Sequence, residues 1–145
     1  MFTEEIAEPE AVSPAEVRAE YEATLEAIID AYGVDAAADE TDFDADRLAA
    51  IRDGDAEAIT TEEAAEVLAL AEDWPPAEDL LLEMQDHVML QMSSAVVDVD
   101  SLATDVEFED DLSAKEIQQR IEGRHPMTLD EYARIHHYLA SENPW

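Results

Sequence analysis

The chain has 145 residues, which suits one domain of ordinary size or two halves that share a core. Its 39 acidic residues stand against seven basic ones, for a formal net charge of −32, and the lack of cysteine excludes disulfides, thiolate metal sites and thiol catalysis. No apolar run approaches the roughly 20 residues of a membrane span and the acidic residues 1–5 exclude a secretory signal, so we expect a cytoplasmic protein.

The first predicted element is an acidic N-terminal arm, residues 1–13, followed by a long helix. Ser13 is a suitable N-cap, Pro14 suits the first helical position, and Glu16 completes a capping box, so the helix begins at residue 14. Apolar residues then recur at three- and four-residue spacing as far as Tyr32. Gly33 is expected to end this helix.

Three shorter helices are predicted next. They span residues 34–41, residues 44–53 with a stop at Gly54, and residues 60 to about 73. The sequence Trp74-Pro75-Pro76 then breaks the chain, because proline donates no helical hydrogen bond. We therefore place a boundary here, with a first helical repeat at 14–74 and a second at 75–145.

The second half opens with a long helix over residues 77–97, which has a broad apolar face and is the expected central helix. A short helix at 99–106 and an acidic turn at 107–112 follow, and Ser113 with Glu116 forms the capping box of another helix, which ends at Gly123. The last helix is expected at 128–141. No strand-like alternation occurs at useful length, so the predicted fold class is all-α.

The two halves repeat one pattern. Residues 48–71 and 117–140 each read as an apolar helix, a glycine, a short polar loop and a Thr-x-x-Glu helix start. An upstream match of residues 26–34 with 95–99 extends each copy to about 68 to 70 residues. The sequence therefore predicts a tandem repeat of two helical units packed around the helices at 14–32 and 77–97.

The first copy resembles the repressor-type helix-turn-helix domains of the lambda repressor and Cro class. Ala38 in the short helix and Gly54 after the third helix lie sixteen residues apart, as in that class, with Asp42 at the turn. In the second copy Ala103 and Gly123 lie twenty apart, so its turn is longer. The resemblance implies that residues 114–123 correspond to a recognition helix.

The whole chain also resembles a small haloarchaeal family of unknown function, most recognisably over residues 116–131. The resemblance implies a haloarchaeal origin and brings no activity. Acidity would then keep the protein hydrated in concentrated salt, where the screening length falls to about 3 Å. The alternative is a functional acidity, in which carboxylates imitate nucleic-acid phosphates.

Charge is unevenly distributed along the chain, because residues 1–113 hold three basic and 34 acidic side chains and residues 114–145 hold four and five. The candidate DNA-binding residues lie in this nearly neutral tail. They are Lys115, Gln118, Gln119, Arg120 and Arg124. Arginine and glutamine suit base edges, yet the corresponding helix of the first copy begins with Asp44 and Asp46, which would repel phosphates.

We therefore favour a non-enzymatic regulatory or protein-interaction module with an unknown protein partner. A DNA-binding regulator reading DNA through the second repeat is the alternative, and an acidic nucleic-acid mimic is a minor one. No nucleophile with a base, phosphate loop or paired catalytic carboxylates stands out, so no enzyme activity, small-molecule substrate, cofactor or metal is expected.

The histidines and methionines are expected to have mainly structural roles. His136 and His137 point about 100° apart on a helix, so they share no metal and are expected at the solvent or an interface. His87 is expected at the edge of the core. The methionines Met84, Met89 and Met92 are expected to fill the core, with an adaptable partner groove as the alternative.

Overall fold

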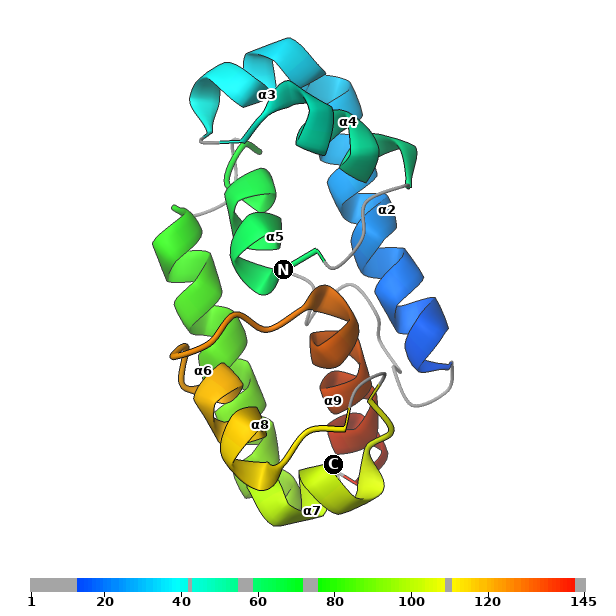
Figure 1. Ribbon diagram of the computed structural model, residues 1–145, viewed down its shortest axis with the longest axis vertical. Coiled ribbons are helices and arrows are strands. Elements are labelled where there is room, and N and C mark those ends of the chain that lie inside the picture. The colour runs from blue at the N-terminus through cyan, green and yellow to red at the C-terminus, as the bar shows by residue number, and fades with distance from the viewer. Residues whose placement is uncertain (1–12, 42, 55–58, 72–75, 109–110, 143–145) are drawn as a thin grey trace.

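The computed structural model describes residues 13–41, 43–54, 59–71, 76–108 and 111–142, and this part of the chain is all-α, without strands (Figure 1). The predicted fold class is thus confirmed. The helices are α2 (Pro14–Tyr32), α3 (Val34–Glu40), α4 (Ala45–Asp53), α5 (Thr61–Leu68), α6 (Ala77–Ala95), α7 (Val99–Asp105), α8 (Ala114–Ile121) and α9 (Leu129–Glu142).

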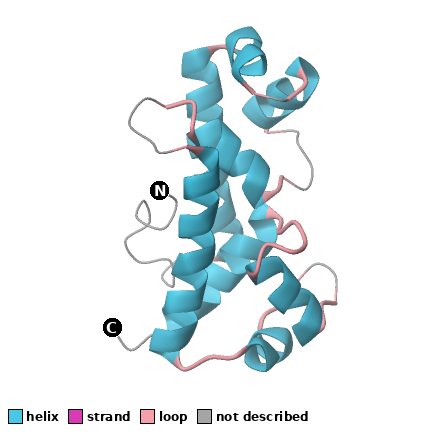
Figure 2. Cartoon of the chain, turned by 90° about the vertical axis from the view of Figure 1, so that its left-hand side faces the viewer, coloured by secondary structure: helices cyan, strands magenta, loops and turns pink. Residues whose placement is uncertain are grey.

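The helices form an elongated molecule with a short helix pair at each end, α3 and α4 at one and α7 and α8 at the other (Figures 1 and 2). Between these ends, α2 packs on α9 and α5 packs on α6, so helices from the two predicted repeats share one core. The largest fully buried side chains include Tyr21, Leu48, Leu80, Leu102 and Tyr132. No helix in the described ranges is long and apolar enough to cross a membrane.

The predicted helix starts hold because side chains satisfy the backbone N–H groups that a helix leaves unpaired at its N-terminus. Reciprocal capping boxes join Thr60 to Glu63, Ser113 to Glu116, and Thr128 to Glu131. At α2, Ser13 accepts a hydrogen bond from the backbone N–H of Glu16. Each such cap is typically worth about 1 kcal/mol.

One predicted helix end differs clearly from the structure, and three predicted segments fall wholly or partly outside the described residues. Helix α5 ends at Leu68 rather than near residue 73, because Leu70 and Ala71 donate to the carbonyls three residues before them, which tightens and closes the last turn. The N-terminal arm up to residue 12, the break at residues 72–75 and residues 109–110 of the acidic turn lie outside the described residues.

The prediction that α6 is the central helix is wrong. Only Leu80, Met84 and Val88 of α6 are buried, whereas Leu82 and Met89 are exposed. Helix α6 packs mainly against α5 and α9, with a smaller contact to α8. Helix α2 carries the longer buried stripe of the two, with Val17, Tyr21, Leu25 and Ile29 in the core.

Candidate functional site

Four of the five candidate DNA-binding residues line one hollow, and the fifth does not. Lys115, Gln118, Gln119 and Arg124 surround a hollow of about 560 Å³ between α8 and the start of α7, together with Asp100 and Glu122. Nε2 of Gln118 donates to Oε1 of Glu122 at 2.9 Å. Nε of Arg124 lies 3.3 Å from the other carboxylate oxygen of Glu122, Oε2. The two cations of the hollow are therefore matched by two carboxylates, which leaves no positive excess for phosphate.

Arg120 instead points toward α9. Its Nε lies 3.3 Å from Oε2 of Glu131, its Nη1 donates to the Glu116 carbonyl, and its side chain is only 13% exposed. Glu131 is the carboxylate of the α9 capping box. Arg120 thus connects α8 to the start of α9, which is a structural role that sequence reasoning missed.

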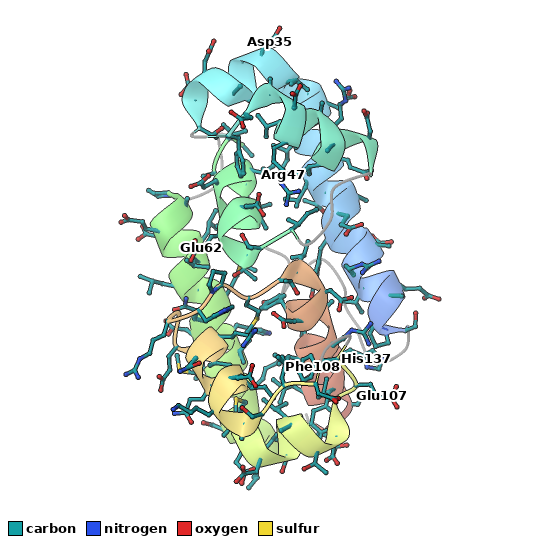
Figure 3. The ribbon with its side chains drawn as sticks, in the orientation of Figure 1. Asp35, Arg47, Glu62, Glu107, Phe108 and His137 are labelled. Carbon is teal, nitrogen blue, oxygen red and sulfur yellow. The ribbon has the colours of Figure 1, made fainter. Side chains whose placement is uncertain are left out.

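The first half contains the same kind of connection. Arg47 on α4, labelled in Figure 3, donates from Nε and Nη2 to the two carboxylate oxygens of Glu63, at 2.9 and 3.0 Å. Glu63 also completes the α5 capping box. Burial alone would raise the pKa of Glu63, but the hydrogen bonds from Arg47 and from the Thr60 backbone outweigh burial and lower it. In both halves an arginine of the third helix therefore holds the start of the fourth.

The exposed apolar side chains gather on α6. Among the described residues the large exposed hydrophobic side chains are Tyr32, Leu82, Met89, Leu90 and Val96, and all except Tyr32 lie on α6 or its C-cap. Leu82, Gln85, Met89, Met92 and Val96 follow each other at alternating spacings of three and four residues, which places them along one side of the helix. We call these five residues the α6 stripe.

The second half of the α6 stripe lies in a stretch without acidic residues. Residues 87–97 contain no aspartate or glutamate, the longest such run in the chain, whereas Glu78, Asp79, Glu83 and Asp86 precede it on the same helix. Met89, Met92 and Val96 line a hollow of about 600 Å³ there. The surface of α6 thus changes along its length from acidic to neutral and apolar. The interpretation of Met89 as a core residue is wrong, while Met84 is buried as expected.

Val96 lies in the left-handed region at φ +56° and is 91% exposed. A β-branched residue rarely adopts this conformation, because its Cβ approaches the following carbonyl oxygen, at a cost of roughly 1–2 kcal/mol. The chain therefore retains a strained and solvated valine where asparagine or glycine would be easier. Such an outlier is a reason to look for function at that position.

His136 corrects the expectation of an exposed or interface histidine, since it is only 2% exposed. Its Nδ1 is hydrogen-bonded to the hydroxyl of Tyr21, and the His87 ring meets it edge-on with the ring centres 5.3 Å apart. Burial, with smaller contributions from His87 and His137, lowers the pKa of His136 to about 4. His87 is half-buried, as expected for the core edge, and within the described ranges no three His, Asp or Glu side chains group as metal ligands.

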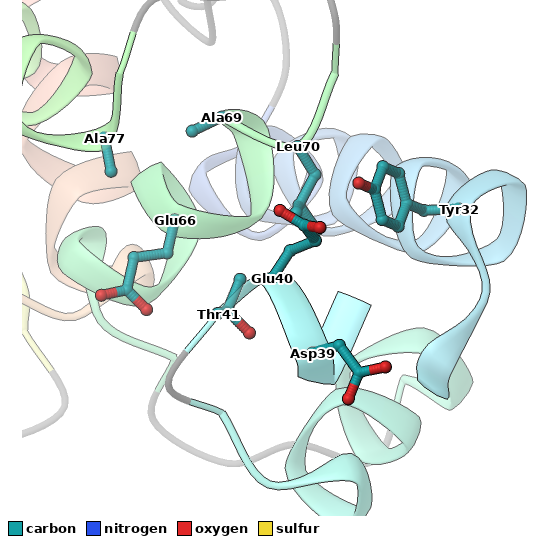
Figure 4. A pocket seen from close by; sticks show the side chains of 8 residues that line it. All are labelled: Tyr32, Asp39, Glu40, Thr41, Glu66, Ala69, Leu70 and Ala77. Carbon is teal, nitrogen blue, oxygen red and sulfur yellow. The ribbon is translucent and has the colours of Figure 1, made fainter. Parts of the chain in front are cut away.

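A further hollow, of about 390 Å³, opens between the ends of α2, α3 and α5 (Figure 4). Asp39, Glu40 and Glu66 line it beside Tyr32 and Leu70. These carboxylates make the hollow unsuitable for phosphate, and nothing else in its lining points to a ligand.

Comparison with known proteins places the chain in a family. The model of a family of unknown function (DUF5791) matches residues 17–142, which include all the helices described except the first turn of α2. The chain belongs to this family. No curated protein and no solved structure matches it. The matched residues include the α6 stripe and the residues of the α8 hollow, but the family assigns no activity to either.

Proposed function

We propose that the protein is a non-enzymatic interaction module that binds an acidic protein partner through the α6 stripe. One observation carries the proposal: in a chain of net charge −32, all the exposed large apolar side chains of the described residues except Tyr32 lie on α6 or its C-cap, and the second half of α6 has no carboxylates. Clustered apolar side chains on an exposed surface are typical of protein-binding sites.

Electrostatics favours an acidic partner over a basic one. A cationic protein would be attracted to most of this surface, and its attraction would be weakest at the neutral half of α6. An acidic protein is repelled by most of the surface and approaches the stretch at residues 87–97 at the lowest cost. The neutral stretch is therefore complementary to another acidic surface that also carries apolar side chains.

The proposal includes the duplication that the sequence predicts. Both runs of four helices contain a 19-residue helix, a seven-residue helix and a third helix whose arginine pairs with the capping glutamate of the fourth. The corresponding positions Thr60 and Thr128 meet in an antiparallel bridge, where Thr61 donates to Met127 and Leu129 to Ile59. We infer two degenerate helix-turn-helix-like units related by an approximate two-fold axis through this bridge.

The same proposal explains the acidity as adaptation to concentrated salt, in keeping with a haloarchaeal origin. DNA binding through α8 remains the alternative. It is less favoured, because Glu122 and Asp100 neutralise the hollow and Arg120 is engaged with Glu131. A nucleic-acid mimic would bind through its carboxylates and would not need the α6 stripe.

The test introduces a photocrosslinking amino acid at Met89 and, as a control, at exposed Ala27 on α2, in cells kept at native salt. We expect an adduct from position 89 only, with a partner of net negative charge. The purified partner should bind Met89→Glu at least tenfold more weakly than the wild type, since the new carboxylate lies in the stripe. Leu90→Glu is the matched control, because Leu90 is more exposed but lies outside the stripe. Equal binding by wild type and Met89→Glu would contradict the proposal.

Val96 offers a separate prediction. Val96→Asn should stabilise the fold by about 1 kcal/mol, because asparagine tolerates the left-handed conformation better than valine. The same change should weaken partner binding, because it removes an apolar side chain of the stripe. Urea unfolding and a binding titration measure the two effects. A loss of stability with unchanged binding would show that Val96 is neither strained nor part of the docking surface.

A further inference from the structure

We infer that the partner seated on the α6 stripe is a second copy of this chain, with the two α6 helices antiparallel and a two-fold axis beside Met89. The inference rests on the proposed function and names its partner. A two-fold interface requires a surface that is complementary to itself. The stripe satisfies this requirement, because Leu82 and Val96 lie seven residues before and after Met89.

The register follows from this symmetry. With the axis beside Met89, Leu82 of one copy lies opposite Val96 of the second copy, and the two Met89 side chains meet at the centre. Exposed Leu82 and Val96 are thereby covered together, and the methionines adapt their shape to the contact. The hollow lined by Met89, Met92, Ser93, Val96, Val97 and Asp98 receives the N-terminal half of the other stripe.

Charge along α6 selects the antiparallel direction. The acidic residues Glu78, Asp79, Glu83 and Asp86 all precede residue 87. In a parallel pair these carboxylates would face the same carboxylates of the second copy. In the antiparallel pair Glu83 and Asp86 face residues 92–95 of the second copy, which carry no charge. The antiparallel arrangement thus keeps Glu83 and Asp86 away from like charges, which the parallel arrangement would pair, and brings Glu78 near Asp100 only at the ends of the contact.

Salt should control this association. Each copy carries a net charge of −32, so long-range repulsion opposes the encounter even where the contact surface is neutral. The screening length is about 10 Å in 0.1 M salt and about 3 Å in 1 M salt. Association should therefore strengthen as the concentration of potassium chloride rises.

The absence of cysteine makes the geometry directly testable, because each introduced thiol is unique. Full-length Met89→Cys, Leu82→Cys, Val96→Cys and the control Ala27→Cys are treated with a short bis-maleimide in concentrated potassium chloride. Among the variants treated singly, we expect efficient crosslinking into dimers only for Met89→Cys. Leu82→Cys should crosslink to Val96→Cys in a mixture and much less to itself, and Ala27→Cys should give none. Sedimentation should show twice the 16.1 kDa mass at high salt and the single mass at low salt.

Three results would overturn the inference. Self-crosslinking of Leu82→Cys equal to that of the mixture would indicate a parallel pair, crosslinking of Ala27→Cys would indicate non-specific collision, and a monomer at every salt concentration would exclude the second copy. A monomer that still forms a photoadduct at position 89 with a different acidic protein would leave the proposed function standing. A monomer without such an adduct would remove both.

Discussion

Lowering the pH from about 6.5 to about 4 is expected to remove about 3 kcal/mol of folding free energy through His136. The folded pKa of His136 is about 4 and the unfolded value is near 6.5, so the unfolded chain binds the proton more readily between these limits. The contribution of the neutral histidine is complete above pH 6.5 and is lost as the pH falls toward 4. The physical cause is burial, since His136 is 2% exposed among Tyr21, His87 and Tyr132.

Protonation of the 39 acidic side chains also changes stability at low pH, so the measurement is a difference between two proteins. Urea unfolding of the wild type and His136→Asn is followed from pH 7 to 4, with exposed His125→Asn as the control. The stability advantage of the wild type over His136→Asn should shrink by about 3 kcal/mol over this range, and the same comparison with His125→Asn shows what replacing a surface histidine contributes. An NMR titration giving His136 a pKa near 6.5 would refute the prediction.

Replacing Arg120 by methionine is expected to cost about 2 kcal/mol, whereas Arg124→Met should cost less than about 0.5 kcal/mol. Arg120 and Glu131 are 13% and 14% exposed at their side chains, so loss of the arginine leaves a mostly buried carboxylate without its cation. The capping bonds of Glu131 to Thr128 moderate the loss. Arg124 is 75% exposed and its pair with Glu122 is at the surface.

Arg120 and Arg124 are therefore matched test positions in one segment of the chain, the first mostly buried and the second exposed. Urea unfolding at fixed salt measures both, and equal stabilities would show that the contact between Arg120 and Glu131 contributes nothing. The result also bears on the DNA-binding alternative. A double replacement of Arg120 and Arg124 would also destabilise the fold, so a loss of DNA retention would have two causes. Lys115 and Arg124 are therefore the positions at which to test retention with little effect on the fold.

Much of the secondary structure could be predicted because its causes are local. Ser13, Thr60, Ser113 and Thr128 each precede a helix by one residue and satisfy its free N–H groups, which requires only neighbours in sequence. Gly33 and Gly54 adopt positive φ where the helices end, as expected of a residue without Cβ. Only α5 ended clearly early.

The candidate site was predicted less well, because it depends on which side of a helix finds a neighbour. Apolar spacing on α6 indicated a broad face, but spacing cannot tell how much of that face another helix covers. His136 stands between Ile135 and His137 in the sequence, and it is buried because α2 packs over α9. Arg120 followed the pattern of a DNA-reading helix, and its contact with Glu131 became visible only when the start of α9 was placed beside it.

By itself, therefore, the sequence determined that the chain is helical, where most helices begin and end, and that its surface is strongly acidic, because capping, glycine geometry and composition act over a few residues. The tertiary structure decided which residues are buried, which cations are neutralised and that Leu82, Met89 and Val96 of the α6 stripe are exposed. These properties arise from contacts between segments far apart in the chain, and their free energy belongs to the pair of surfaces that meet rather than to either segment.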